Sequence, residues 1–136
     1  MYIASILFQI FIVSFLLNLV WEIAHSRLYK TCLRMSFREI IRLATKMSLK
    51  DGFWISLFYL TTVLIFNNTN ILTNYIQLLV FIALALGFSF ADEKISISKK
   101  RWQYSKRMPK VFKVGISPLF ELAVTGILTF LYVFLI

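Results

Sequence analysis

The sequence has few of the cysteine and histidine residues that often act as nucleophiles, acid–base groups or metal ligands. It has one cysteine, Cys32, and one histidine, His25, among 136 residues. A single cysteine excludes a disulfide framework and a cysteine-based metal cluster. We expect a plain thiol, with acylation beside the membrane as the alternative. No nucleophile elbow, phosphate-binding loop or CxxC motif occurs either, so the signatures of those hydrolase, nucleotide-binding and redox sites are missing.

Charge is absent from long stretches of the chain. Residues 1–21, 52–91 and 122–136 contain no Asp, Glu, Lys or Arg, and 60% of all residues are hydrophobic. A soluble domain of this size would expose far too much apolar surface. Apolar runs of about 18 residues or more are typical of membrane spans. The sequence therefore predicts an all-α, polytopic membrane protein that forms a single domain over residues 1–136.

The first apolar run differs from a signal peptide. No basic residues precede it, it is too long, and no small-x-small cleavage site follows it. We expect a retained first span over about residues 2–24. Because no Gly or Pro occurs before Gly52, this helix could continue past the membrane surface to about Leu33.

Three further spans are predicted, over about residues 50–66, 71–91 and 118–136. We expect Asp51 to be the N-cap of the second span and the charged residues 92–94 to end the third. Ser117 would be the N-cap of the fourth span, with Pro118 at its first position.

A short basic helix is predicted between the first two spans. Ser36 and Glu39 have capping-box spacing, and after them apolar side chains recur at the helical period between basic ones. This pattern is typical of an amphipathic helix that lies in the membrane interface. We place it at about residues 36–48.

All 15 Lys and Arg residues fall within residues 25–50 and 94–113. Loops beside membrane spans that carry such an excess face the cytoplasm. We therefore predict cytoplasmic loops at 25–49 and 92–117, with both termini and the Asn-rich turn at 67–70 outside, in a bacterial inner membrane. The basic residues behind the net charge of +9 would then orient the spans and attract anionic lipid headgroups. Membrane lipids are the expected partners, and nucleic acid is not.

Polar residues recur on one face of each predicted span, at spacings of three or four residues. In the first span they are Ser14, Asn18, Glu22, His25 and Tyr29. In the fourth span they are Glu121, Thr125 and Thr129. The third span has Asn74 and Gln77, with Asp92 five turns beyond Asn74, and the second has Ser56, Tyr59 and Thr62 or Val63. Because polar groups in a bilayer turn toward protein, these stripes predict four transmembrane helices in a bundle with a polar seam.

The acidic residues of this bundle gather near its cytoplasmic end. An ionisable residue inside a membrane span is by default a candidate for function. We take Glu22, His25 and Glu121 as candidate catalytic residues. The candidate ligand-binding residues are Asn18, Trp21, Tyr29, Asp92, Glu93, Trp102 and Tyr104.

A purely structural role is the alternative for these side chains. Near the headgroups, Glu22 and Glu121 could pair with loop arginines and fix the helices in register. For Asp92 and Glu93 this structural role is the favoured interpretation. His25 would then be a hydrogen-bonded spectator, although it shares a helical face with Glu22.

Glu22-x-x-His25 has the spacing of a di-metal ligand motif on a bundle helix. Such a site needs two copies of the motif and two more carboxylates, and this chain has one copy. Only a symmetric dimer could supply the second. We therefore expect no metal and no cofactor.

Several short motifs together resemble a group of small uncharacterised bacterial membrane proteins with four helices. They are Trp21-Glu22-x-x-His25 with Leu28-Tyr29, Glu93, Trp102-x-Tyr104, Met108-Pro109 and Gly115-x-x-Pro118-Leu119. The resemblance covers most of the chain and implies a fold but no activity. Glu121 stands where the group would have glutamine, which puts a catalytic role for this acid in doubt. Pro118-x-x-Glu121 is also similar to a motif of lycopene-cyclase membrane domains.

The leading functional hypothesis is a polar site that binds or converts an amphipathic lipid or isoprenoid. Glu22 and Glu121 would act as acid and base, His25 would orient or share the proton, and aromatic side chains would line the entry.

Two alternatives stay open. One is a homodimeric small transporter coupled through Glu22, although the charge bias forbids dual topology and Glu22 lies near the membrane surface. The other is an accessory or assembly subunit whose basic loops dock a membrane protein partner. A dehydrated polar cavity around Glu22 favours an enzyme or a transporter, whereas arginine-paired carboxylates favour the accessory role.

Overall fold

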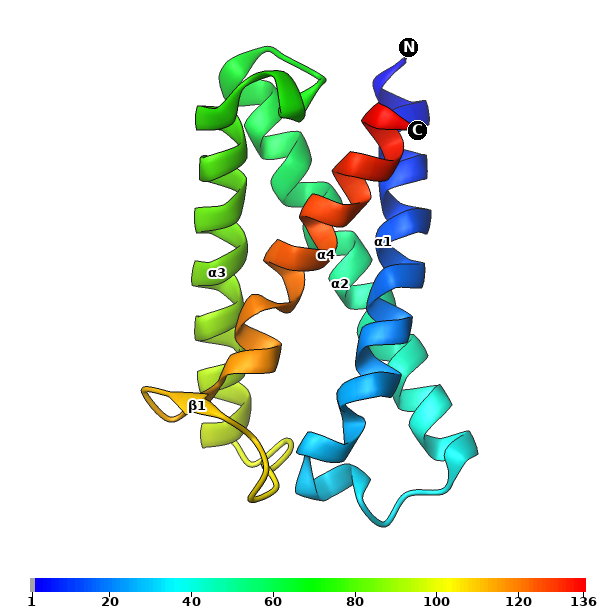
Figure 1. The fold of residues 1–136 in the computed structure, drawn as a ribbon, viewed down its shortest axis with the longest axis vertical. Coiled ribbons are helices and arrows are strands. Elements are labelled where there is room, and N and C mark those ends of the chain that lie inside the picture. The colour runs from blue at the N-terminus through cyan, green and yellow to red at the C-terminus, as the bar shows by residue number, and fades with distance from the viewer. Residues whose placement is uncertain (1) are drawn as a thin grey trace.

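The computed structural model describes residues 2–136 and has, within them, four long helices (Figure 1). They are α1 (Ile3–His25), α2 (Phe37–Phe66), α3 (Tyr75–Ser98) and α4 (Ile116–Leu135). All four are long and apolar enough to cross a membrane. The prediction of an all-α chain with four candidate spans is therefore confirmed.

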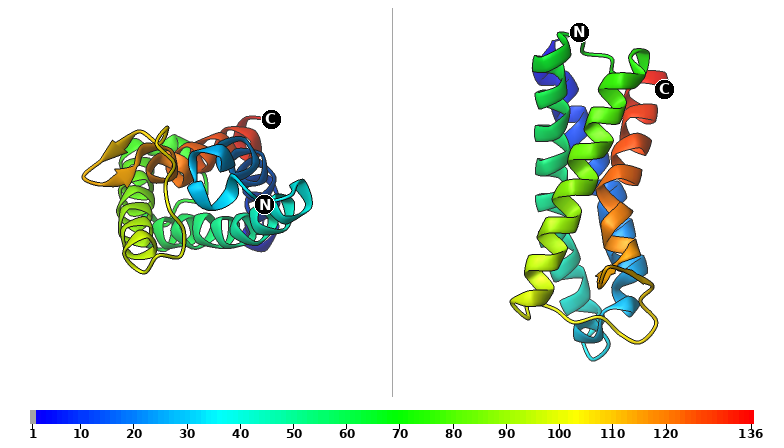
Figure 2. Two further views of the ribbon diagram at one scale, coloured as in Figure 1. Left: turned by 90° about the horizontal axis from the view of Figure 1, so that it is seen from below. Right: turned by 90° about the vertical axis from the view of Figure 1, so that its left-hand side faces the viewer.

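The helices pack as a bundle in which each touches two main neighbours. α1 contacts α2 and α4, and α3 contacts α4 and α2. Figure 2 shows the four helices around a common centre, and Figure 1 shows α4 crossing from beside α3 at its start to beside α1 at its end. Both termini and the α2–α3 turn lie at one end of the bundle (Figure 1), which we call the uncharged end. The α1–α2 and α3–α4 connections lie at the other end, which we call the basic end.

α2 is one continuous helix of 30 residues, and this corrects two predictions. The capping box of Ser36 and Glu39 starts it as expected, with Glu39 N donating to Ser36 Oγ at 3.2 Å. The helix then continues without a break through residues 48–52. There is no separate helix over 36–48, and Asp51 is an interior residue, not an N-cap.

The continuity of α2 follows from its buried face. Inward-facing residues recur every three or four positions along its whole length: Ala44, Ser48, Asp51, Ile55, Tyr59 and Thr62. Gly52 lies on this face against α1, where a Cβ would be 3.4 Å from the Phe11 ring, an ordinary packing distance. The Gly-containing stretch therefore packs against α1 and does not break the helix.

α3 begins and ends later than predicted. Its N-cap is Asn74, whose side chain accepts hydrogen bonds from the N–H groups of Ile76 and Gln77. It continues past the acidic pair to Ser98. The inward stripe is Gln77, Phe81, Ala85, Ser89 and Glu93, four residues apart. Glu93, and not Asp92, thus lies on the buried face of α3.

The ends of α1 and α4 also differ from the prediction. α1 stops at His25, and short 3₁₀ turns follow it at Ser26–Leu28 and Lys30–Cys32. α4 has Gly115 at its N-cap, so the expected start at Pro118 is late. The reason is a small antiparallel hairpin of β1 (Lys110–Val111) and β2 (Val114–Gly115), which leads directly into the helix.

A close contact between α3 and α4 holds the middle of the bundle. The Phe81 ring lies against Gly126, where a Cβ would come within 2.5 Å of the ring. Phe81 and Phe130 stack edge to face with ring centroids 4.7 Å apart. Together with Ile10 and Ile55 these rings are fully buried, so the core between the two ends is filled by side chains.

Candidate functional site

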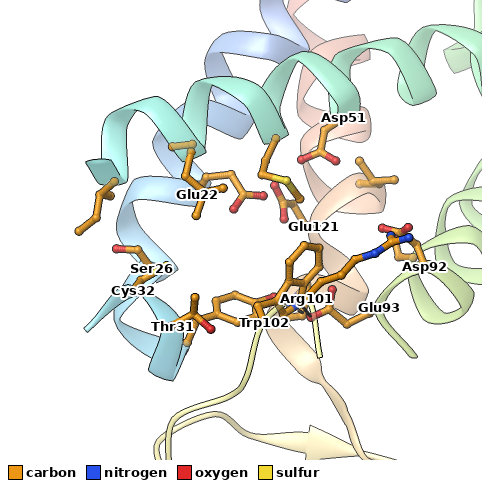
Figure 3. Close-up of a pocket in the computed structure, with 18 of the residues that line it drawn as sticks. Glu22, Ser26, Thr31, Cys32, Asp51, Asp92, Glu93, Arg101, Trp102 and Glu121 are labelled. Carbon is orange, nitrogen blue, oxygen red and sulfur yellow. Dashed lines mark hydrogen bonds between the residues drawn. The ribbon is translucent and has the colours of Figure 1, made fainter. Parts of the chain in front are cut away.

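A cavity of about 200 Å³ lies at the basic end of the bundle (Figure 3). One wall is apolar and comes mainly from α2 and the segment before it. It is formed by Met35, Ile40, Leu43, Ala44, Met47, Phe88 and Leu122. The polar lining includes five carboxyl groups, those of Glu22, Asp51, Asp92, Glu93 and Glu121. The cavity therefore joins an apolar surface to an acidic one.

Glu22, His25 and Glu121 meet at the deep end of the site. His25 Nε2 lies 3.4 Å from Glu22 Oε2 and 3.6 Å from Glu121 Oε1. Glu121 is 5% exposed and His25 8% exposed. No arginine within residues 2–136 forms an ion pair with either glutamate. Glu22 and Glu121 are therefore not paired with loop arginines in the described part of the chain.

Asp51 belongs to the same cluster, and the sequence interpretation missed it. Its carboxyl group points toward those of Glu22 and Glu121 (Figure 3), and each of the three groups acts electrostatically on the other two. The residue is 9% exposed, and its Oδ2 atom is buried without a hydrogen-bond partner. The signal was its spacing of four residues from Ile55 on the buried face of α2. Its apparent role as an N-cap concealed that signal.

Glu93 organises the loop-side wall of the cavity, which we call its floor, through one oxygen atom. Its Oε1 accepts hydrogen bonds from Tyr29 Oη at 2.8 Å and from Trp102 Nε1 and Tyr104 Oη at 2.9 Å. Burial together with the Glu93 charge raises the pKa of Tyr29, and burial raises that of Tyr104. Both phenols therefore stay protonated as donors. Sequence separation hid this network, although all four residues were candidates.

Backbone pairing holds these aromatic residues in place. Tyr29 and Tyr104 form an isolated antiparallel bridge. On either side of it, Lys30 N donates to Gln103 O and Ser105 N donates to Leu28 O, both at 2.7 Å. The segment after α1 and the α3–α4 connection thus form a common floor beneath the cavity.

Gly115 and Met108 fix the other side of this floor. A Cβ at Gly115 would lie 2.8 Å from Met108 Sδ, so a larger residue there would make the buried Met108 side chain move. Gly115 N also donates to Tyr104 Oη at 3.0 Å. Three of the motifs that carry the resemblance, around residues 102–104, 108–109 and 115–119, therefore meet in one place.

Asp92, Asn18 and Trp21 are not members of the Glu22, His25 and Glu121 cluster. Asp92 lines the cavity and binds Lys50 at 3.1 Å. Asn18 lies deeper in the bundle, where its Oδ1 accepts from Thr125 Oγ1 at 3.2 Å. Trp21 packs edge to face against His25, with ring centroids 6.3 Å apart, and both residues line a second pocket and not the cavity itself. Asn18 and Trp21 are thus supports of the cluster and do not line the cavity.

Cys32 also borders the cavity, as a buried free thiol. Burial raises the pKa of this thiol, and a thiol that keeps its proton is a poor nucleophile. The thiol at Cys32 therefore has low nucleophilicity, and its modification state stays a prediction.

The donor atoms at the deep end could also hold a metal ion. His25, Glu22 and Glu121 each offer one ligand atom, and the three atoms lie within 4.8 Å of one another. The chemistry open to the cluster is thus proton transfer among carboxyl and imidazole groups, or cation binding. No family model, curated protein or solved structure matches this chain, so the function is argued from this geometry.

Proposed function

We propose that this chain is an integral membrane protein that binds an amphipathic lipid or isoprenoid in the cavity at its basic end and acts on its polar group. The observation that supports the proposal is the composition of the cavity lining. An apolar wall from α2 faces a cluster of carboxyl groups on α1, α2 and α4. Sites for small molecules combine apolar walls with a few convergent polar groups in this way.

The polar group of the ligand would carry hydrogen-bond donors. Carboxylate oxygens accept hydrogen bonds and attract cations, so a hydroxyl or an amine suits the deep end of the cavity. Glu22 and Glu121 are the groups placed to exchange a proton with it, and His25 lies between them. The apolar wall would hold the first part of the hydrocarbon chain.

The ligand would enter from the cytoplasmic leaflet. This follows from the charge distribution, since all Lys and Arg residues lie in or beside the two connections at the basic end and such loops face the cytoplasm. A membrane-impermeant thiol reagent tests the orientation in a Cys32→Ser background. Asn70→Cys should react in intact cells, whereas Lys100→Cys should react only after lysis. The reverse pattern would contradict the proposed entry side.

Filling the cavity tests ligand binding. Leu43→Trp places a large ring in the apolar wall, and Leu49→Trp is the matched control, because Leu49 is exposed on the same helix and does not line the cavity. Native mass spectrometry of protein purified in mild detergent should find a lipid or isoprenoid retained by the wild type and by Leu49→Trp. Leu43→Trp should lose it. Equal retention by both variants would show that the cavity is not the binding site.

The filled core favours this proposal over a transporter. Ile10, Ile55, Phe81 and Phe130 close the bundle between the cluster and the uncharged end. The acidic cluster opens on one side of this barrier, as a one-sided binding site would.

A further inference from the structure

The distances from His25 to Glu22 and Glu121 are long for hydrogen bonds. His25 Nε2 lies 3.4 Å from one carboxylate oxygen and 3.6 Å from the other. N–H···O hydrogen bonds are usually about 2.7–3.2 Å long. His25 Nε2 thus lies between two carboxylates, and both distances are longer than a normal N–H···O hydrogen bond.

The same spacing suits ligands around one metal ion. Zn²⁺ binds His nitrogen and carboxylate oxygen at about 2.0–2.2 Å in a tetrahedron, whose edges are about 1.6 times that length, or about 3.3–3.6 Å. Both His25 distances fall in or at the limit of this range. The two carboxylate oxygens also lie within 4.8 Å of each other, so one ion can contact all three atoms after a small movement of the side chains.

Unpartnered atoms in the cluster give an independent indication of a ligand. Both ring nitrogens of His25 are buried without a hydrogen-bond partner, and so is Glu121 Oε2. A buried polar atom left without a partner costs about 1–3 kcal/mol. His25 is 8% exposed, and Nε2 is the ring atom that faces the two glutamates. A cation at this point would satisfy His25 Nε2, the unpaired atom that faces the two carboxylates.

The charges around the cluster also call for a cation. Glu22, Asp51 and Glu121 lie close together inside the bundle, where carboxyl groups either keep their protons or bind a compensating cation. Lys50 is the basic residue whose charge reaches Glu22 and Asp51, but its ammonium group binds Asp92 at 3.1 Å. A divalent ion among the three acids would balance two of their charges.

We propose that Glu22, His25 and Glu121 bind a single divalent transition-metal ion, for which Zn²⁺ is the best fit. Imidazole selects against Mg²⁺ and Ca²⁺, which prefer oxygen ligands. Three protein ligands leave a fourth position free, as in catalytic zinc sites. That position faces the cavity, because Glu22 and Glu121 both line it. Asp51 lies beside it as an acceptor for a metal-bound water or for the polar group of a ligand.

This site differs from the di-metal site whose ligand spacing Glu22-x-x-His25 shares. Glu-x-x-His supplies two ligands from α1, and the third comes from the start of α4. A second copy of the chain is not needed. The inference rests on the proposed function only for the identity of what the metal would act on.

Metal binding can be measured directly on the detergent-purified protein after removal of metal with a chelator. Co²⁺ is the probe, because a low-symmetry four-coordinate Co²⁺ site absorbs visible light strongly. All proteins carry Cys32→Ser, which removes the one natural thiol. We expect one equivalent of Co²⁺ to give a visible band that one equivalent of Zn²⁺ abolishes. The absence of a saturable band, together with no Zn²⁺ binding by calorimetry, would overturn the proposal.

Ligand variants locate the site. His25→Gln and Glu121→Gln should each lower metal affinity by about 100-fold or more, since even residues that only support metal ligands contribute about 10–100-fold. Asp92→Asn is the matched control, because it removes a carboxylate from the same cavity but not from the cluster. It should bind as the wild type does. If His25→Gln and Glu121→Gln bind the metal as tightly as Asp92→Asn and the wild type do, the metal binds elsewhere and the assignment is wrong.

If His25→Gln and Glu121→Gln fail to fold, His25→Cys provides a second test of the same site. Thiolate is also a zinc ligand, so this variant should bind Co²⁺ and add a sulfur-to-cobalt charge-transfer band in the near ultraviolet. A folded His25→Cys protein without that band would also refute the site.

The lipid-retention measurement and the metal-binding measurement can each refute one proposal without refuting the other. Metal binding with no retained lipid would sustain the metal centre and reject the lipid site. Retained lipid with no metal binding would reject the metal centre and leave Glu22, His25 and Glu121 as a group that shares protons.

Discussion

His25 Nε2 on α1 lies 3.6 Å from Glu121 Oε1 on α4, and this contact joins the first helix to the last at the deep end of the cavity. The stripe of α1 reaches the cluster because Asn18, Glu22 and His25 share one face of the helix. Glu121 reaches it because α4 starts directly from the β1–β2 hairpin. The position of the α4 start therefore determines whether the cluster forms.

Glu93→Ala should destabilise the protein strongly. The substitution leaves three donors, on Tyr29, Trp102 and Tyr104, without their acceptor. Tyr29 is buried and the other two are half-buried, and an unsatisfied buried donor costs about 1–3 kcal/mol. We expect the free energy of unfolding in mixed detergent micelles to fall by about 2 kcal/mol or more. Trp102 fluorescence should shift to longer wavelength as the side chain becomes exposed.

Asp92→Ala is the control for that measurement. Asp92 precedes Glu93 and forms a partly exposed ion pair with Lys50, which is worth about 1 kcal/mol or less. If the two alanine variants lose equal stability, the Glu93 network does not hold the floor of the cavity.

Gly126→Ala and Gly87→Ala should have opposite effects on stability. Alanine is favoured over glycine in a helix by about 1 kcal/mol. At Gly87 no atom lies within 4 Å of the added Cβ, whereas at Gly126 the Cβ would lie 2.5 Å from the Phe81 ring. Overpacking of this kind costs about 1–3 kcal/mol. The midpoint of thermal unfolding should rise or stay constant for Gly87→Ala and fall for Gly126→Ala, and a rise for both would contradict the close packing of α3 on α4.

Asn18 and Thr125 should be energetically coupled. The Thr125 hydroxyl on α4 donates to Asn18 Oδ1 on α1 at 3.2 Å and shares its proton with Glu121 O at 2.8 Å. Hydrogen bonds between membrane helices contribute about 0.6 kcal/mol on average. A double-mutant cycle of Asn18→Ala with Thr125→Val should show a coupling of about this size. The same cycle with Thr129→Val should show none, because the Thr129 hydroxyl donates to Thr125 O within α4.

The stability of the protein should fall above about pH 10. Burial and the Glu93 carboxylate raise the pKa of Tyr29 in the folded protein, while an unfolded tyrosine ionises near about pH 10. The stabilising contribution of this phenol is therefore complete below about pH 10 and is lost as the pH rises further, because only the unfolded chain then releases the proton. Unfolding measured between pH 8 and 11 should show a steeper loss for the wild type than for Tyr29→Phe. Parallel curves would mean that Tyr29 ionises normally.

The sequence by itself determined the number of helices, their approximate positions and the face of α1 and α4 that turns inward. Uncharged runs identify the spans, and the spacing of Asn18, Glu22 and His25 identifies a helical face without reference to other segments. The capping box of Ser36 and Glu39 is a local signal for the same reason, since all its partners lie within four residues.

Only the tertiary structure decided which polar residues meet. Asp51 lies inside α2 because the buried face continues through it, and its local sequence instead suggested an N-cap. Glu93 and not Asp92 turns inward because α3 begins at Asn74 and keeps its phase to Ser98. The meeting of Glu22 and His25 with Glu121, and of Tyr29 with Trp102 and Tyr104, depends on how helices and loops cross in space. Helical periodicity fixes the faces of one segment, and packing fixes which faces come together.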